Sequence, residues 1–224
     1  MKENINYPVI VKEGVFSRED KYRFHCWVNI DGEDVLCYMP SNFKFEKVYS
    51  IKGKMVLLSE NTDSKSKFKY KVEAVKYRNS LMLLNFSYLN RVVEYELPRK
   101  IFAFLGKRKN ILHERNIQGY KSDLYIEDTK TLIEIKSVLA FSVDAEYPVN
   151  YSSHMLEQLD KLSGLAADNI NVYYFIIGLG PTLKRIRINL SSNYGRLVDK
   201  CRQVGVHFVA MNLHVKEGRY CINK

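Results

Sequence analysis

The sequence predicts an α+β protein of mixed architecture, in which an N-terminal OB-like β-barrel over residues 1–86 precedes an α/β domain with a mixed sheet over residues 87–224. The first segment is a succession of short strand-like runs separated by turn residues, which is typical of small barrels. The second alternates strand and helix patterns, which is typical of an α/β sandwich. A chain of 224 residues also exceeds the commonest size of a single domain, so we expect two domains.

The predicted barrel contains a hairpin near its start. Alternating apolar and polar residues at 23–30 and 33–39 flank Asp31 and Gly32, and this dipeptide favours a tight turn between antiparallel strands. Further strand-like runs follow at 54–58, 68–75 and 81–86. The last of them can close the sheet, which gives a partly open barrel of the OB type.

Aromatic and basic side chains are interleaved within the predicted barrel. The group comprises Phe24, Trp27, Tyr38, Phe43, Phe45, Arg23, Lys44 and Lys47. Barrels of this type bind single-stranded nucleic acid by stacking bases on aromatic rings in a basic groove, and we assign Arg23, Trp27 and Tyr38 to this role. The alternative is that the rings belong to the core, because aromatic residues are enriched in strands for packing reasons alone.

The predicted second domain begins with two short helical segments at 92–97 and 101–106, the second of which lies between a proline and a glycine. A helix at 152–167 is predicted by apolar residues on one side and by a serine or asparagine available as N-cap. The apolar run 172–177 has the length and composition of a strand buried on both faces. The remaining predicted elements are a strand at 183–189, a helix at 194–204 and a strand at 206–212.

Between these helical segments, residues 122–137 carry one acid, and then an acid and a lysine, on two short strands. In an extended chain the isoleucines before and after Glu134 point into a core, while Glu134 and Lys136 share the opposite face. Asp123 lies across the predicted hairpin from that face. The pattern therefore predicts two carboxylates and an ammonium group at one place.

A carboxylate pair beside a lysine matches the needs of metal-assisted phosphodiester cleavage. Carboxylates are the hard oxygen ligands that Mg²⁺ prefers, and a cation near the attacking water and the scissile phosphate assists the reaction. The spacing of Asp123, Glu134 and Lys136 is that of a PD-(D/E)XK nuclease core. Taken alone, this spacing is a weak signal in a chain so rich in charged residues.

The composition is compatible with such a function. Lysine and arginine total 35 against 25 acids, which gives a formal net charge of +10 and favours polyanionic partners such as nucleic acid, although scattered surface lysines give the same total. The four cysteines lie far apart, and the N-terminal segment lacks the features of an export signal, so we expect reduced thiols in a cytoplasmic protein. The longest apolar stretch is far too short to span a bilayer.

Several segments match one known family over nearly the whole length of the chain. They are Glu13-Gly14-Val15-Phe16 with Arg23-Phe24, residues 70–75, Glu114 nine residues before Asp123, residues 133–138, and Gly205-Val206 after a helix. With these segments, and most specifically with Ile-Glu-Ile-Lys-Ser-Val at 133–138, the chain resembles the sugar fermentation stimulation protein family (SfsA). The resemblance implies an OB-like domain joined to a PD-(D/E)XK restriction-endonuclease-like domain.

The resemblance also implies a set of metal ligands. Asp123 would bridge Mg²⁺ or Mn²⁺, with Glu134 and the carbonyl group of Ile135 completing the protein side of the site. Glu114 is expected as a further metal ligand, the alternative being a surface acid paired with Arg115.

Basic and polar residues nearby are expected to act on the substrate. Lys136 would orient or deprotonate the attacking water, or stabilise charge in the transition state, and the sequence leaves these roles open. Lys121 occupies a place where the family prefers arginine, which indicates a phosphate contact. Gln158 and Lys161 share one polar face of the predicted helix and are expected to reach the nucleic acid, the alternative being a merely solvated face.

Two segments, 38–43 and 147–153, depart from the family pattern. The whole sequence predicts a cytoplasmic, Mg²⁺-dependent nuclease that cuts DNA, RNA or both. The alternative is a non-catalytic DNA-binding or regulatory protein that keeps the nuclease fold, and a third reading is a basic scaffold that binds anions non-specifically. The sequence leaves open the preferred strand, the mode of cleavage and whether the chain forms a homodimer.

Overall fold

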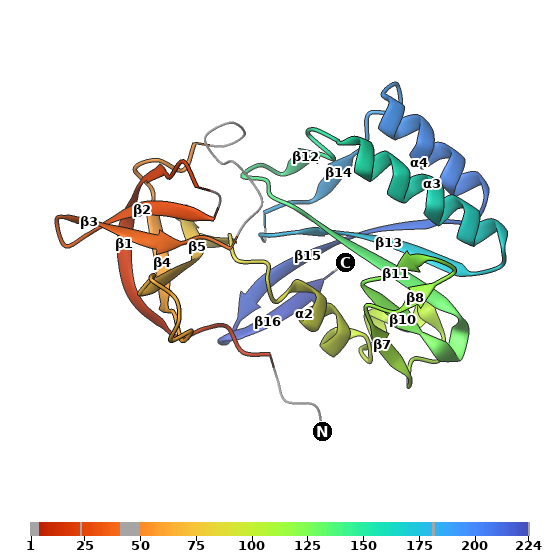
Figure 1. The fold of residues 1–224 in the computed structure, drawn as a ribbon, viewed down its shortest axis with the longest axis horizontal. Coiled ribbons are helices and arrows are strands. Elements are labelled where there is room, and N and C mark those ends of the chain that lie inside the picture. Colours follow the sequence, from red (N-terminus) through yellow and green to blue (C-terminus); the bar gives the residue numbers. More distant parts are fainter. Residues whose placement is uncertain (1–4, 23, 41–49, 181, 224) are drawn as a thin grey trace.

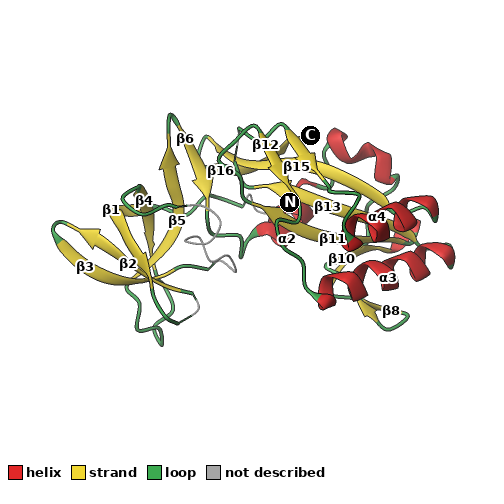
Figure 2. Cartoon of the chain, turned by 90° about the horizontal axis from the view of Figure 1, so that it is seen from above, coloured by secondary structure: helices red, strands yellow, loops and turns green. Residues whose placement is uncertain are grey.

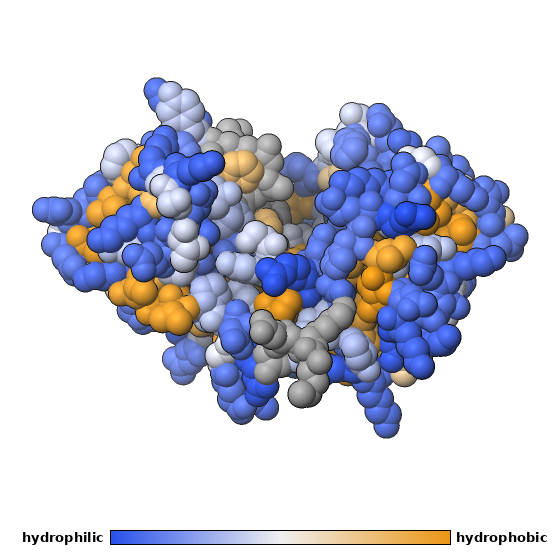
Figure 3. Space-filling model, turned by 60° about the horizontal axis from the view of Figure 1, so that its bottom comes forward, coloured by the Kyte–Doolittle hydropathy of each residue, from blue (hydrophilic) through white to orange (hydrophobic). Residues whose placement is uncertain are grey.

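The computed structural model describes residues 5–22, 24–40, 50–180 and 182–223. It has two lobes (Figure 1), one built of strands alone and one in which helices lie over a sheet. The face of the molecule shown in Figure 3 is mostly hydrophilic, with separate hydrophobic patches on both lobes. No helix in the described ranges is long and apolar enough to cross a membrane.

The first lobe is a six-stranded sheet in the order β3-β2-β1-β4-β5-β6, closed by a pairing of β3 with β5. Its strands are β1 (Ile10–Glu19), β2 (His25–Ile30), β3 (Glu33–Tyr38), β4 (Met55–Glu60), β5 (Tyr70–Tyr77) and β6 (Ser80–Leu83). The predicted hairpin is β2–β3, and its turn residues Asp31 and Gly32 both have positive φ, at 54° and 95°, as a primed turn requires. The OB-like barrel predicted from the sequence is confirmed.

Strand β1 lies inside this sheet, paired with β2 and β4, although the sequence did not predict it. Gly14 explains part of its placement. A Cβ atom at Gly14 would lie 2.5 Å from Cγ1 of Val28 and 2.7 Å from the carbonyl oxygen of Asn29, so only glycine permits this close approach of β1 to β2.

The second lobe is a mixed sheet in the order β16-β15-β13-β11-β10-β7. Its strands are β7 (Ile111–His113), β10 (Leu124–Ile126), β11 (Thr131–Val138), β13 (Asn171–Gly178), β15 (His207–Lys216) and β16 (Arg219–Asn223). Strands β11, β13 and β15 are parallel, and the other pairings are antiparallel. The predicted mixed sheet is thus confirmed.

Helices α3 (Ser153–Ala167) and α4 (Asn193–Gln203) lie along one face of this sheet (Figure 1). The other elements in the described part of the chain are three short helices and two short strand pairs. The helices are α2 (Leu89–Glu96), η1 (Lys100–Leu105) and η2 (Glu127–Thr129), and the pairs are β8 (Asn116–Ile117) with β9 (Tyr120–Lys121) and β12 (Asp144–Glu146) with β14 (Arg185–Arg187). Ser152 caps α3 by accepting a hydrogen bond from the amide of Met155, as predicted. Two predicted strands, 81–86 and 183–189, are shorter in the structure, as β6 and β14.

The side chains of β11 alternate between two cores. Ile133 and Ile135 pack into a cluster that also contains barrel residues such as Leu58, whereas Leu132 and Val138 pack into a cluster with α3 and α4. Glu134 therefore lies on the sheet face that carries the helices. This alternation, predicted from the sequence, positions the candidate site.

The two lobes share the first of these cores and are joined by backbone contacts. The amide of Leu83 in β6 donates to the carbonyl of Leu179, which follows β13, at 2.9 Å. The amide of Tyr7 donates to the carbonyl of Gly218 at 2.8 Å, so the first described residues lie against the C-terminal hairpin rather than the barrel. Figure 2 shows β6 on the side of the barrel nearest to the second sheet.

Candidate active site

The antiparallel pairing of β10 with β11 sets Asp123 beside Glu134. Leu124 pairs with Ile133, and Asp123 immediately precedes Leu124. Its Oδ2 accepts a hydrogen bond from the amide of Ile135 at 2.7 Å, and its Oδ1 accepts one from Nδ2 of Asn90 on α2 at 3.0 Å. Both oxygens of the carboxylate are therefore fixed by neighbouring elements.

Glu134 is buried, with 3% of its surface exposed, and its carboxylate receives three donors. The hydroxyl of Tyr120 donates to Oε2 at 2.7 Å. Oε1 accepts from Nζ of Lys136 at 2.5 Å and from Nε2 of Gln158, on α3, at 3.3 Å. The carboxylate is held at its position from three elements, β9, β11 and α3.

The electrostatics of this site favour a cation. Burial and the neighbouring charge of Asp123 raise the pKa of Glu134, and Lys136 opposes this shift. Burial, and then the charge of Glu134, raises the pKa of Tyr120, which therefore stays protonated and donates to the carboxylate. One ammonium group, bound to Glu134, thus accompanies two neighbouring carboxylates, and the residual negative charge is suited to a bound positive ion.

Glu114 and Lys121 lie close to Asp123 in the chain fold but face solvent. The amide of Glu114 donates to the carbonyl of Asp123 at 3.2 Å, yet its side chain forms an exposed ion pair with Nζ of Lys121 at 2.7 Å. The side-chain hydrogen bond from Lys121 lowers the pKa of Glu114. The partner of Glu114 is thus Lys121 and not Arg115. In the described part of the chain no three acidic, histidine or cysteine side chains gather to hold a metal, so the convergence of three carboxylates does not occur there.

The other predicted substrate contacts are distributed over both lobes. Gln158 reaches the site through Glu134, whereas Lys161 is exposed on α3. Arg23 lies outside the described residues. Trp27 and Tyr38 are half-buried in the barrel lobe, so they are neither full core residues nor a freely exposed platform.

Each of these two rings has neighbours that hold it in place. The indole Nε1 of Trp27 donates to Asp20 at 2.8 Å, and the Arg18 guanidinium lies 4.9 Å from the ring centroid. Tyr38 packs against Phe24 and Phe68 at centroid distances of 6.2 Å and 5.8 Å.

Sequence reasoning missed two residues that support the carboxylates, Asn90 and Tyr120. Asn90 is 33 positions before Asp123, and only the packing of α2 against the sheet brings them together. Tyr120 had a local signal, because it lies just before the acid on the same short segment and carries a hydroxyl donor.

The donor set fits a divalent cation. Asp123 and Glu134 offer hard carboxylate oxygens of the kind that Mg²⁺, Mn²⁺ and Ca²⁺ prefer, and no thiol or imidazole is among their hydrogen-bonding neighbours in the described residues.

An OB-like barrel followed by a mixed sheet of the restriction-endonuclease type defines the fold class of the protein. The chain belongs to the sugar fermentation stimulation protein (SfsA) family, since the model of the sugar fermentation stimulation protein RE domain matches residues 87–219.

Individual relatives agree with this assignment. A sugar fermentation stimulation protein homolog of Pelagibacter ubique is 23% identical over 209 residues, which cover 90% of each chain. A homolog of Clostridium kluyveri is 24% identical over 119 residues, about half of each chain. The structure of Pyrococcus furiosus SfsA in complex with Ca²⁺ superposes with a TM-score of 0.82 at 15% identity, covering 99% of this chain and 96% of that one, and so shows the same fold.

Proposed function

We propose that the protein is a divalent-metal-dependent nuclease that hydrolyses phosphodiester bonds of DNA, RNA or both. The observation that carries the proposal is the pair of hydrogen bonds that bring the three side chains together: Asp123 accepts from the amide of Ile135, and Lys136 donates to Glu134, on the two residues either side of that amide. Structural ion pairs rarely need two adjacent carboxylates, one of them buried, because their repulsion costs stability. A metal-dependent hydrolytic site does need them.

Asp123 and Glu134 would hold Mg²⁺ or Mn²⁺, and the carbonyl of Ile135 is the third candidate ligand. When bound, such an ion polarises the phosphoryl oxygen and lowers the pKa of a coordinated water. The complex of the Pyrococcus relative with Ca²⁺ supports a divalent ion in this family, since Ca²⁺ takes the same oxygen ligands. Glu114 would join the set only after its exposed pair with Lys121 opens.

Lys136 is the chain's own cation at the reacting centre. Its Nζ contacts Oε1 of Glu134, and 24% of its side chain is exposed, so it is open to a substrate phosphate. From this position it would orient the attacking water or stabilise negative charge in the transition state. Gln158, which shares Oε1, would then help to keep Glu134 in place.

The rest of the molecule would supply nucleic-acid affinity. We propose residues 1–86 as an OB-like binding domain and residues 87–224 as the nuclease domain. Trp27 and Tyr38 are the proposed base contacts of the first, and the exposed Lys121 and Lys161 the proposed phosphate contacts of the second. The net charge of +10 supports a polyanionic partner.

The test is a cleavage assay with labelled single- and double-stranded DNA and RNA in Mg²⁺, Mn²⁺ or EDTA. We expect products in Mg²⁺ or Mn²⁺, none in EDTA, and none from Glu134→Gln. The control Asp199→Asn removes an exposed carboxylate of α4 that accepts a hydrogen bond from Gln203, and should cleave like the wild type. Equal cleavage by Glu134→Gln and the wild type would assign the activity to a contaminant or to another site.

One observation favours a second candidate, a non-catalytic nucleic-acid-binding protein that keeps the fold. In the described residues Glu134 is neutralised in part by Lys136, and only two carboxylates lie together. This candidate expects metal-independent binding and no cleavage on any substrate in the same assay.

A further inference from the structure

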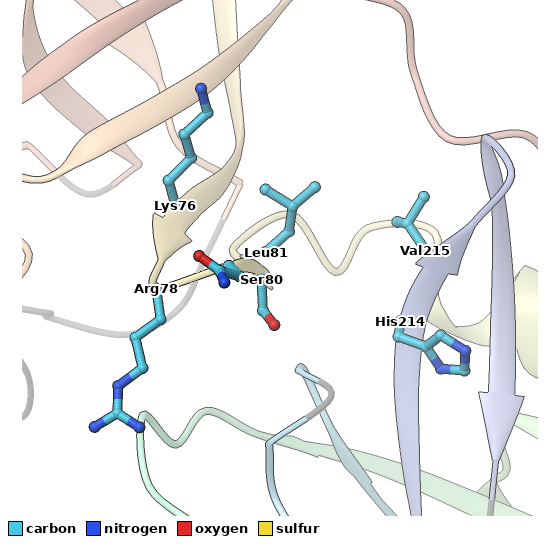
Figure 4. Close-up of a pocket in the computed structure, with 7 residues that line it drawn as sticks. Lys76, Arg78, Ser80, Leu81, His214 and Val215 are labelled. Carbon is cyan, nitrogen blue, oxygen red and sulfur yellow. The ribbon is translucent and has the colours of Figure 1, made fainter.

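A recess lies between the β5–β6 hairpin of the barrel and strand β15 of the second sheet (Figure 4). Its volume is about 400 Å³, which is enough for a small ligand or one unit of a polymer. It is lined by Lys76, Arg78, Asn79, Ser80, Leu81, His214 and Val215.

A second recess of about 360 Å³ shares Arg78 with the first. It is lined by Tyr77, Arg78, Phe141, Ser142, Val143 and Thr182. Arg78 therefore stands where the two recesses adjoin, at the tip of the hairpin, and its φ of 55° is unusual for a residue other than glycine, asparagine or aspartate.

The lining is basic. None of the described residues that line either recess is acidic. The Arg78 guanidinium lies 5.4 Å from the centroid of the Tyr77 ring, and Nζ of Lys54 lies 5.7 Å from the same centroid. Lys76 forms an exposed ion pair with Glu13. Arg78 is therefore the cation that both recesses present to an anion.

Aromatic and unsatisfied polar groups accompany this cation. Tyr77 and Phe141 are half-buried and meet edge to face, with ring centroids 5.0 Å apart. The hydroxyl of Thr182 is buried without a hydrogen-bond partner in the structure. Since an unmade hydrogen bond of a buried group is costly, a ligand or water that reaches the hydroxyl is favoured.

The second recess lies beyond the carboxyl ends of β11 and β13, and β11 is the strand that carries Glu134. Phe141 and Val143 follow the end of β11 at Val138, and Thr182 follows the end of β13 at Gly178. These strands are parallel, so their carboxyl ends meet at one edge. The path along β11 from Glu134 to Val138 is four residues, roughly 13 Å. Phe141 is three residues further on, at most roughly 11 Å. An extended single strand of a few nucleotides can therefore reach from one place to the other.

We propose that the two recesses bind one strand of single-stranded nucleic acid, with a phosphate at Arg78 and a base against Tyr77 and Phe141, and lead it to the active site. Unstacked bases have free faces for aromatic rings, whereas the faces of a duplex are hidden. The proposal rests on the proposed function for its ligand class, but it concerns binding and not cleavage.

The test measures affinity for a fluorescent oligonucleotide in EDTA, where no metal-dependent cleavage occurs. Arg78→Gln removes the charge at the centre of the site. Arg202→Gln is the matched control, because Arg202 lies 5.4 Å from the ring centroid of Phe208, near the end of α4. We expect Arg78→Gln to weaken single-strand binding at least fivefold and to reduce the salt slope by about 0.7, and Arg202→Gln to stay within twofold of the wild type.

A second variant guards against an effect on folding. Phe141→Leu keeps apolar packing but removes the aromatic face, and we expect it to weaken binding roughly 5- to 100-fold at an unchanged melting temperature. Equal binding by Arg78→Gln and Arg202→Gln would overturn the proposal, and so would a wild type that binds no oligonucleotide. An Arg78→Gln variant that loses affinity for duplex to the same extent as for single strands would also overturn it. If Arg78→Gln weakens single-strand binding as expected but the wild type cleaves no substrate, the nuclease function is contradicted and the binding proposal stands.

Discussion

Oδ2 of Asp123 accepts a 2.7 Å hydrogen bond from the amide of Ile135, the residue between Glu134 and Lys136. This bond joins the turn before β10 to the middle of β11. Because side chains alternate along a strand, it places the Asp123 carboxylate next to the face that carries Glu134 and Lys136. The backbone of β11 thereby fixes the position of the Asp123 carboxylate relative to Glu134.

The first prediction concerns metal binding by this pair. Asp123→Asn keeps an oxygen acceptor for the Ile135 amide but removes one charge, so millimolar Mg²⁺, Mn²⁺ or Ca²⁺ should raise the melting temperature of the wild type and not of the variant. Differential scanning calorimetry measures both. Asp199→Asn should retain the metal response. A melting temperature independent of metal in the wild type would argue against an ion site.

The second prediction concerns Tyr120, the buried donor to Oε2 of Glu134. Tyr120→Phe leaves the buried carboxylate short of one donor and should reduce the free energy of unfolding by roughly 1.5–3 kcal/mol in urea titrations. Tyr125→Phe is the control, since that hydroxyl makes no hydrogen bond within the described residues, and should change stability by at most about 0.5 kcal/mol. Equal effects of the two variants would show that the Tyr120 hydroxyl does not support Glu134.

Much of the fold follows from local patterns in the sequence. The turn at Asp31 and Gly32, the cap at Ser152 and the apolar run of β13 each specify an element by short-range chemistry. Strand β1 escaped prediction because it is mostly exposed, with only Gly14 and Phe16 buried, so it lacks the apolar alternation of a strand. Short strands such as β7 are formed by pairing with neighbours and leave no periodic signal.

The candidate site also contains residues that the sequence could locate and residues that it could not. Asp123, Glu134 and Lys136 could be located because one hairpin carries all three. Asn90 could not, because its contact depends on how α2 packs against the sheet. Glu114 was expected among the ligands from the family resemblance, and in the structure its exposed side chain pairs with Lys121.

The third prediction tests the close approach of β1 to β2. Gly14→Ala forces a Cβ against the side chain of Val28 and the backbone of Asn29, and should destabilise the protein by roughly 1–3 kcal/mol. Gly164→Ala is the opposite case, since nothing lies within 4 Å of its added Cβ on α3, and should stabilise by about 0.4–1 kcal/mol. Urea unfolding of both variants measures this. Tolerance of Gly14→Ala would contradict the observed packing.

The fourth prediction concerns pH. The Asn110 amide and then Lys107 lower the pKa of Asp128 to about 2. The folded pKa lies below the unfolded value of about 3.9, so the charged form adds stability above pH 4, and this contribution is lost as pH falls toward 2. The difference in melting temperature between the wild type and Asp128→Asn should therefore shrink over that range. A difference that stays constant from pH 7 to pH 2 would contradict the assigned contacts.

The most direct test of the central claim is single-turnover cleavage by Lys136→Ala, with affinity measured on the same substrate. If Lys136 acts on the water or the transition state, the rate should fall by roughly 10²–10⁴ while affinity stays within a few fold, because one cation among many contributes little to binding. Lys200→Ala, which removes an exposed lysine from α4, should leave both unchanged. A rate for Lys136→Ala equal to that of the wild type, or a loss of rate matched by an equal loss of affinity, would contradict a catalytic role for the Asp123, Glu134 and Lys136 site.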